Sequence, residues 1–480
     1  MVFTVIRIFF AINGIVGCTF LIPVLTALAC REYQVLPSFV IPMTTSIVLA
    51  VIFIIAGRKT KIRLNNRSAF IVVALAWISA SLFSAIPLYA SGAIPRLADA
   101  VFESTSGFST TGATILNDIE SLPRSINLWR CETHWLGGMG IVALTVALLP
   151  IMGVGGFQLI KAETTGPEKG KLTPKITNTA KILWILYVSM TAVETLLLKI
   201  AGMDFIDALS HAFATLGTGG FSTKNASIGY YKSAPIDWII IIFMFLAGIN
   251  FSLYYYLFTG KLSEIKKDSE MKVYIAIIVA VSLTITAIEL PRYSSVLQSL
   301  RFSTFQVITL ITTTGFSTAD YTLWHPASQV LIFMLFFIGG SSGSTSGGIK
   351  VIRITIVAKQ LYNEVKRMLH PHGVFSIRIN QRAGRKDVVF NVTAFLFAYF
   401  ALIVISTFIS ALAGIDIFTS FTASTSMLGN FGPAFNKLGP SCNYSWLPDA
   451  IKWWYCFIML TGRLEIYTML IFFFPSFWKK

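Results

Sequence analysis

Four short turns rich in Ser, Thr and Gly interrupt an otherwise apolar chain, and their residue types could bind a cation. They are Thr110-Thr111-Gly112, Thr215-Leu216-Gly217, Thr313-Thr314-Gly315 and Met427-Leu428-Gly429, the last followed by Asn430. Irregular backbone survives at membrane depth only where it is buried in protein or lines a wet cavity, so four such turns predict one shared pore. Glycine permits a partly left-handed path, and backbone carbonyls aimed at an axis can replace the hydration shell of an ion.

The chemistry of these turns favours a monovalent, weakly hydrated cation such as potassium. Backbone carbonyls are neutral, whereas a filter for divalent cations would more often use a ring of carboxylates. Glu103 is acidic but has no acidic counterpart at the matching places of the other three turns. A calcium or magnesium pore is therefore disfavoured.

The composition indicates that these turns lie in a membrane protein. Of the 480 residues, 55% are hydrophobic and only 12% are charged, and the mean hydropathy is +0.71. Soluble domains are nearer a quarter charged. Apolar runs of the ~20 residues needed to cross a bilayer recur along the chain, for example at 69–90, 182–200, 236–258 and 388–413. The sequence therefore predicts an all-α polytopic membrane protein.

The basic residues are distributed unevenly between the two sides of the predicted membrane. Of the 38 Lys and Arg, 26 fall at the termini and in four segments assigned to one side: 58–67, 161–181, 261–272 and 350–386. This asymmetry is the positive-inside pattern, which predicts both termini in the cytoplasm and an even number of spans. The net charge of +16 is thereby explained without a nucleic-acid partner.

The apolar runs and the turns together predict five units. A hairpin of two spanning helices, at 4–30 and 37–56, precedes four repeats of helix, pore segment and helix in a pseudo-fourfold arrangement, with about ten transmembrane helices in all. The spanning helices of the repeats are expected at 69–90 and 130–160, 177–200 and 236–258, 271–290 and 327–360, and 388–413 and 449–475. The units are 1–67 for the hairpin and its basic loop, and 68–165, 166–268, 269–380 and 381–480 for the pore repeats.

Each pore segment is expected to be a short helix whose carboxyl end points toward the middle of the membrane. Asp99, Asp207 and Asp416 open three of the four segments, where an acidic side chain complements the positive end of the helix dipole. The opposite end carries partial negative charge and would stabilise a dehydrated cation.

The register of the turns has an alternative in the first two repeats. Gly107 and Gly220 begin a recurring Gly-Phe-Ser-Thr string and are rivals to Gly112 and Gly217 as the pore glycines. We prefer Gly112 and Gly217 because a small or apolar pair precedes each of them, as Met-Leu precedes Gly429 in the fourth repeat.

These residues resemble a known family. Helix, pore segment and helix, repeated four times with a glycine in each turn, is similar to the Trk/Ktr/HKT superfamily of potassium transporters. The extra hairpin, the stretch Ser-Gly-Phe-Ser-Thr-Thr-Gly-Ala-Thr at 106–114 and Trp-Leu-Gly-Gly-Met-Gly at 135–140 resemble the bacterial TrkH-type membrane subunit. The resemblance covers nearly the whole chain. It implies potassium uptake across the bacterial cytoplasmic (inner) membrane, a homodimer, and a cytoplasmic nucleotide-binding regulatory subunit of the TrkA type.

A glycine-rich stretch indicates a gate. Residues 339–348 read Gly-Gly-Ser-Ser-Gly-Ser-Thr-Ser-Gly-Gly and cannot remain a regular helix, because glycine is costly in a helix interior. The apolar run at 330–338 is too short to span alone, which favours an intramembrane loop over a cytoplasmic linker. The expected gate residues are Gly339, Gly340, Gly343, Gly347 and Gly348. The family resemblance likewise implies a loop that blocks permeation beneath the filter.

Arg463 is the second candidate gate residue. It falls in the last apolar run, where a charged side chain is expensive and should face the bundle interior. We expect it to project below the filter, bind carbonyls of the glycine-rich loop and raise the barrier for a cation. The alternative is a structural pair with Glu465 or with backbone carbonyls. Glu465 is a poor sole partner, because residues two apart do not share a helix face.

Other functions find less support in the sequence. The chain has no G-x-x-x-x-G-K-[ST] loop for ATP, no zinc-ligand spacing and no legible Ser/His/Asp set, so a membrane-embedded enzyme is a remote alternative. A channel and a symporter driven by protons or sodium are harder to separate. Glu194 and Glu465 are the acids that could serve coupling, and either could equally be part of a helix-packing pair. We expect a potassium pore that also admits rubidium and cesium.

Overall fold

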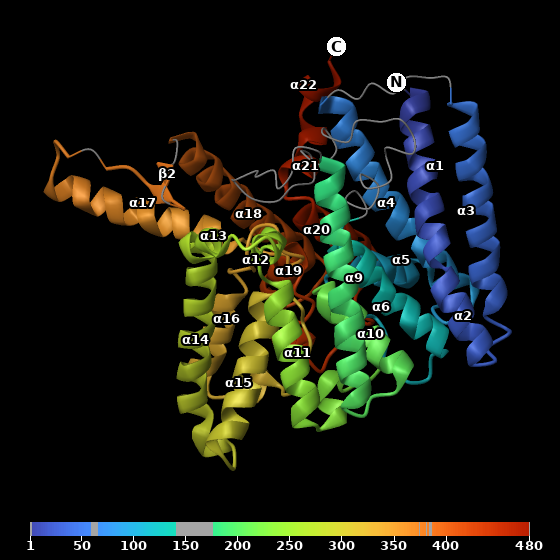
Figure 1. Ribbon diagram of the computed structural model, residues 1–480, viewed down its shortest axis with the longest axis horizontal. Helices are drawn as coiled ribbons and strands as arrows, with labels where there is room; N and C mark the ends of the chain where they lie inside the picture. The colour runs from blue at the N-terminus through green and yellow to red at the C-terminus, as the bar shows by residue number, and fades with distance from the viewer. Residues whose placement is uncertain are drawn as a thin grey trace.

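The computed structural model is built almost entirely of helices (Figure 1). It describes residues 2–58, 66–140, 176–373, 375–380, 382–383 and 386–479. The α-helices are α1 (Val2–Thr19), α2 (Leu21–Ala29), α3 (Leu36–Ala56), α4 (Asn66–Ala90), α5 (Leu97–Phe108), α6 (Arg124–Gly138), α9 (Ile176–Ile200), α10 (Phe205–Leu216), α11 (Ala234–Ala247), α12 (Phe251–Phe258), α13 (Leu262–Lys267), α14 (Ser269–Glu289), α15 (Val296–Ile311), α16 (Pro326–Leu335), α17 (Val351–Leu369), α18 (Lys386–Leu412), α19 (Ile417–Gly429), α20 (Asp449–Arg463), α21 (Tyr467–Leu470) and α22 (Pro475–Trp478). Short 3-10 turns are η2 (Ser227–Tyr231), η3 (Leu290–Arg292), η4 (Tyr321–Leu323), η5 (Asn436–Leu438) and η6 (Ile471–Phe473). Two short antiparallel strands are β1 (Arg378–Ile379) and β2 (Arg382–Ala383).

Six helices in the described part of the chain are long and apolar enough to cross a membrane. Two bent pairs raise this number to eight: α11 with α12, bent by 92°, and α20 with the segment Tyr467–Phe473, bent by 118°. Ten crossings were expected from the sequence. The expected span at 130–160 runs past residue 140 and lies partly outside the described residues, and the one at 327–360 is divided between α16 and α17.

Several of the long helices lie at the periphery of the molecule. Figure 1 shows α1 and α3 side by side at one flank and α14 with α15 at the other, with α17 projecting away from the remaining helices. The two termini lie at the same end of the molecule (Figure 1). Large apolar side chains on the outer helices are exposed, such as Ile55 on α3 and Phe397 on α18. A bilayer accounts for this exposure, because lipid tails are as apolar as these side chains.

Four short helices occupy the interior. Most side chains of α5, α10, α15 and α19 are buried. Each follows a long helix, α4, α9, α14 or α18, and packs against it. Three begin with a side-chain cap, in which Asp204, Ser295 or Asp416 accepts a hydrogen bond from a backbone N–H of the first turn. These caps fix the start of each short helix and therefore the position of its other end.

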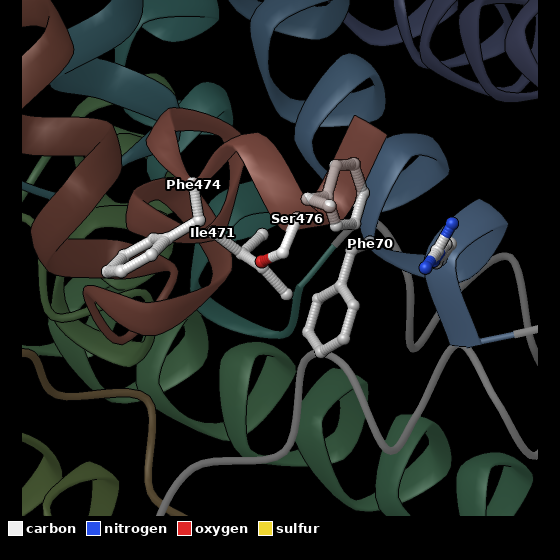
Figure 2. A pocket seen from close by; sticks show the side chains of 6 residues that line it. Phe70, Ile471, Phe474 and Ser476 are labelled. Carbon is white, nitrogen blue, oxygen red and sulfur yellow. The ribbon is translucent and has the colours of Figure 1, made fainter. Parts of the chain in front are cut away.

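A surface pocket is lined by residues outside these four short helices. It has a volume of about 310 Å³ and lies between the start of α4 and the last residues of the chain (Figure 2). Its lining is mostly apolar and consists of Arg67, Phe70, Ile471, Phe474, Ser476 and Phe477. Arg67 donates a hydrogen bond to the carbonyl of Lys479, which ties the C-terminal segment to α4.

Candidate functional site: a ring of four glycine turns

All four short helices end in the same backbone turn. A residue in the left-handed region, with φ between 52° and 56°, is followed two positions later by a glycine with φ between 78° and 89°. The left-handed residues are Thr110, Thr218, Thr313 and Asn430, and the glycines are Gly112, Gly220, Gly315 and Gly432. In each turn the residue between them donates its N–H to the carbonyl five positions earlier. These bonds are Thr111 to Ser106 at 2.9 Å, Gly219 to Ala214 at 2.9 Å, Thr314 to Thr309 at 2.7 Å and Phe431 to Ser426 at 3.0 Å.

The four turns meet in a closed ring. A Cβ atom added to any of the four glycines would collide with the backbone just before the glycine of the next repeat. The order is cyclic: Gly112 lies against Gly219, Gly220 against Thr314, Gly315 against Phe431, and Gly432 against Thr111. Only glycine fits at these positions, both because φ is positive and because the neighbouring backbone occupies the space of a side chain.

The ring opens into a cavity of about 130 Å³. All four ring glycines line this cavity, together with the extended segments that follow them. Other lining residues include Asn117, Lys224, Asn225 and Cys442. Backbone from four parts of one chain therefore converges on this opening.

The structure places two of the four expected glycines in the ring and two outside it. Gly112 and Gly315 are ring members. Gly217, with φ −69°, caps α10, and Gly429 is the last residue of α19. The sequence-based register was therefore three residues too early in the second and fourth repeats. Thr215, Leu216, Met427 and Leu428 consequently belong to the last helical turns rather than to the extended turns.

Gly217 and Gly429 contribute instead to packing between repeats. A Cβ on Gly138, where α6 ends, would lie 2.5 Å from the Cα of Gly217. A Cβ on Gly347 would lie 2.6 Å from the carbonyl oxygen of Gly429. These glycines let the end of α6 approach the end of α10, and the glycine-rich stretch 339–348 approach the end of α19. Close approach of this kind is the common role of small residues between membrane helices.

A polar residue seven positions before each of the first three left-handed residues holds the outgoing segment of its turn. Glu103 accepts hydrogen bonds from the Thr114 hydroxyl at 2.9 Å and the Ile115 N–H at 2.9 Å. His211 Nε2 lies 2.9 Å from the Ser222 hydroxyl, and Gln306 donates to the Ala319 carbonyl at 3.1 Å. In the fourth repeat the adjacent position serves, because the Thr422 hydroxyl accepts the N–H of Phe435 at 3.4 Å. These tethers could not be recognised from the sequence, because their common spacing appears only when the register of the turns is known.

Glu103 is neutralised by a buried arginine. Arg130 Nη2 lies 2.6 Å from the Glu103 carboxylate, and both side chains are 0% exposed. The arginine also lies over the Phe221 ring, with 4.4 Å from Cζ to the ring centroid. The acid of the first repeat is thus occupied by an ion pair and by the tethers, and does not offer a free carboxylate to the opening.

The glycine-rich stretch forms a folded loop between α16 and α17. The loop closes on itself, because Gly339 donates to the Ile349 carbonyl at 2.7 Å and Val351 donates to Gly340 at 3.2 Å. It touches the ring through Gly347, whose N–H donates to the Thr313 hydroxyl at 2.7 Å. Gly343 and Gly348 have φ of 73° and 67°, which glycine adopts without strain.

Glu270, at the start of α14, anchors this loop at both sides. Its carboxylate accepts the N–H of Ser342 at 2.7 Å, the hydroxyl of Ser342 at 2.6 Å and the N–H of Ile352 at 3.0 Å. The residue is 5% exposed. A buried carboxylate with three donors is a strong anchor, because charge-assisted hydrogen bonds are roughly twice as strong as neutral ones.

Arg463 lies at the end of α20, where the chain bends sharply, rather than within a continuous span. Its guanidinium donates to the carbonyl of Thr345 in the glycine-rich loop at 2.7 Å. It also donates to the carbonyls of Gly137 at 2.6 Å and Gly138 at 3.0 Å, at the end of α6. Glu465 pairs with Arg353 of α17. Arg463 thus links three elements that converge beside the ring.

Comparison with known proteins gives a consistent result. The chain matches the family model TrkH, described as a cation transport protein, over residues 36–291 and 273–480. It is 39% identical over 448 residues to the Trk system potassium uptake protein TrkH of Halomonas elongata, covering 92% of both chains. It is 40% identical over 429 residues to the Trk system potassium uptake protein TrkH of Escherichia coli K12, covering 88% of both. The crystal structure of the potassium transporter TrkH from Vibrio parahaemolyticus superimposes with a TM-score of 0.88 at 34% identity, covering 100% of both chains.

Proposed function

The chain belongs to the TrkH family of cation transport proteins, and from that premise we propose that it takes up potassium through a pore built by a single chain. Family membership makes it a multi-pass membrane transporter rather than an enzyme. Potassium is then the transported substrate, as in the relatives named for potassium uptake.

The observation that carries this proposal is the closed ring of four glycine turns. Backbone from Gly112, Gly220, Gly315 and Gly432 meets in cyclic order at one opening. In the proposed filter, carbonyl oxygens of these turns replace the water around the ion. The dipoles of α5, α10, α15 and α19 add partial negative charge where each helix ends at the ring. The Glu103–Arg130 pair leaves no free carboxylate at this point, which supports a monovalent cation.

The glycine-rich loop and Arg463 form the proposed gate. The loop is bonded to the third filter turn through Gly347 and Thr313. Arg463 holds the loop through the Thr345 carbonyl and places a positive charge among these elements. A fixed guanidinium beside the path of a cation raises the barrier to its passage. Opening then requires the loop to leave Thr313 and Arg463 to release its carbonyls.

The proposed organisation is that of a pseudo-fourfold pore with an added hairpin. The units are 1–67, 68–165, 166–268, 269–380 and 381–480, with about ten crossings of the bacterial inner membrane. Both termini are proposed to be cytoplasmic, which is supported by their common end in Figure 1 and by the basic segments.

The proposed partners are a second copy of the chain, a cytoplasmic nucleotide-binding subunit of the TrkA type and membrane lipid. The projection of α17 away from the other helices supports a contact outside the single chain. Its exposed apolar side chains are Val357, Leu361, Tyr362, Val365, Met368 and Leu369.

Coupled symport with protons or sodium is the second candidate mechanism. Buried acids at membrane depth can serve coupling, and Glu132 and Glu194 are both 0% exposed. A reversal potential measured in proteoliposomes separates the two mechanisms. A potential that follows the potassium gradient alone indicates a channel, and a steady shift with the proton or sodium gradient indicates coupling.

The filter itself is tested by serine substitutions at the ring glycines. Gly220→Ser and Gly432→Ser should lower the potassium-to-sodium permeability ratio by about tenfold, because the new side chain collides with the next turn. Gly414→Ser is the matched control, since Gly414 has φ 82° but no atom within 4 Å of an added Cβ. Unchanged ratios for both ring variants, with the protein present in the membrane, would refute the filter assignment.

A further inference from the structure

The residue just before the ring glycine has a side chain in the first, third and fourth repeats, and is a glycine in the second repeat. The Thr111 hydroxyl lies 2.7 Å from that of Ser109, and the Thr314 hydroxyl lies 2.8 Å from that of Thr312. In the last repeat the Phe431 ring stacks on Phe336, with centroids 5.0 Å apart. Each of these side chains supports its turn through a contact of its own, which we call the brace of that turn. The second repeat has Gly219 at this position, so its turn lacks an internal brace.

An imidazole from the first repeat occupies the missing space. A Cβ added to Gly219 would collide with the ring of His134, which belongs to α6. His134 is 0% exposed, and its ring packs against Phe221 with centroids 4.2 Å apart. Phe221 directly follows the ring glycine Gly220. The imidazole therefore lies against the backbone on both sides of that glycine.

The two ring nitrogens connect two repeats. Nε2 accepts the backbone N–H of Phe221 at 3.2 Å, and Nδ1 lies 2.8 Å from the carbonyl oxygen of Gly107 in α5. Because an N–H needs an acceptor and a carbonyl needs a donor, this pair of contacts requires the neutral tautomer with hydrogen on Nδ1. His134 thus ties the second turn to the pore helix of the first repeat.

We propose that His134 is a positioning residue that replaces the side chain missing at Gly219 and thereby sets the discrimination between potassium and sodium. This inference rests on the proposed filter. Glycine is the most flexible residue, and the second turn has two in succession, Gly219 and Gly220. Without the imidazole, this quarter of the ring can contract toward an ion smaller than potassium. The other three quarters keep their own braces.

At the boundary between the second and third repeats a different residue takes the place of His134. His134 lies four residues before Gly138, where α6 ends, and the corresponding position in α11, four residues before Gly248, is Met244. A thioether donates no hydrogen bond and accepts only weakly. The filter turn of the third repeat has Thr314 as its own brace and does not require such a bridge.

Two amide substitutions separate the bonds of His134. Asn places its amide nitrogen near the position of Nδ1 and can keep the bond to Gly107, whereas Gln reaches the position of Nε2 and can keep the acceptor for Phe221. His134→Gln should stay within about twofold of the wild-type potassium-to-sodium permeability ratio, while His134→Asn and His134→Ala should lower it about five- to tenfold. A purely structural role in α6 would not distinguish Asn from Gln in this ratio.

A double substitution tests the link with Gly219. Gly219→Ala alone should lower the ratio, because the methyl group collides with the imidazole. In the His134→Ala background the same methyl group has room and restrains the turn, so the double variant should exceed His134→Ala by about two- to threefold. Equal permeability ratios for His134→Asn and His134→Gln would overturn the proposal. So would strictly additive effects of Gly219→Ala and His134→Ala on the ratio in the double variant.

The measurement distinguishes this inference from the proposed function. Rubidium uptake into proteoliposomes by the wild-type protein tests the pore itself, and absence of uptake would count against the pore. Uptake by the wild type together with an unchanged ratio in His134→Ala would reject only the role of His134. If His134→Ala fails to reach the membrane, the Asn and Gln variants provide the comparison.

Discussion

Gly347 donates its backbone N–H to the hydroxyl of Thr313 across 2.7 Å, and this bond joins the glycine-rich loop to the ring of turns. Thr313 is the left-handed residue of the third turn, so its side chain is held in place by the same backbone that forms the proposed filter. The loop and the ring of turns are therefore in direct contact in this conformation. In the proposed gating mechanism, movement of the loop breaks this bond before the path beneath the ring opens.

Replacing Thr313 by Val should favour the open loop. Valine has the same shape but no acceptor, which leaves the Gly347 N–H buried without a partner at a cost of about 1–3 kcal/mol in the closed conformation. The initial rate of rubidium uptake should rise by about threefold or more. Thr313→Ser keeps the hydroxyl and should behave like the wild type. Equal rates for the Val and Ser variants would show that the bond does not hold the loop.

Replacing Arg463 by Ala should also raise potassium flux, for an electrostatic reason. The substitution removes a fixed positive charge and three hydrogen bonds to the carbonyls of Thr345, Gly137 and Gly138. Arg463→Lys keeps the charge but cannot reproduce the planar fork of the guanidinium. Its flux should therefore lie between that of the wild type and that of Arg463→Ala. Currents recorded at equal protein density test this order. Unchanged flux in Arg463→Ala at normal expression would rule out the gate role.

Glu270 offers a test of the loop that leaves the filter and Arg463 intact. Glu270→Ala leaves two backbone N–H groups and one hydroxyl without their acceptor and should raise basal flux about fivefold. Glu270→Gln retains one oxygen that can accept both N–H groups and should have a much smaller effect. The contrast between Ala and Gln, at unchanged potassium-to-sodium selectivity, distinguishes release of the loop from damage to the filter.

Cys442 provides a chemical test of the opening above the ring. It is an exposed free thiol and lines the cavity that all four ring glycines share. A cationic methanethiosulfonate reagent attached there should repel incoming cations and reduce rubidium uptake by at least about half. Cys442→Ser should be insensitive to the reagent. Sensitivity that persists in the Ser variant would place the reactive thiol elsewhere.

Competition among alkali cations tests the oxygen-lined filter. Rubidium and cesium should both reduce potassium uptake, because carbonyl oxygens bind monovalent cations of similar size without specific chemistry. Failure of both ions to compete would count against a filter of backbone carbonyls.

The long helices could be predicted from the sequence because apolar length alone defines them. The expected spans at 177–200, 271–290 and 388–413 agree with α9, α14 and α18 within two residues. The sharp bends after Ala247 and Arg463 could not be predicted in the same way, because apolar residues continue on both sides of each bend. The family resemblance carried by the turn and glycine motifs is confirmed.

The register of the turns was only half predictable, for a physical reason. Thr-Leu-Gly and Met-Leu-Gly look like Thr-Thr-Gly, but in the structure they end helices, and the glycines of the ring come three residues later. The useful signal was the left-handed residue, and Asn430 is of a type often found there. Gly220, the rival candidate in the second repeat, is the ring member. The tethers from Glu103, His211 and Gln306 depend on that register and could not be recognised before it.

Because one polypeptide supplies all four sides of the ring, no two sides need be alike. A channel assembled from identical subunits must repeat any substitution around its axis, whereas here a carboxylate, an imidazole, an amide and a hydroxyl each secure a different side. In the proposed filter, a single mutation thus alters one quarter of the ion's surroundings and leaves the rest intact. Evolution, or an engineer, can adjust the preference of such a pore in small, independent increments.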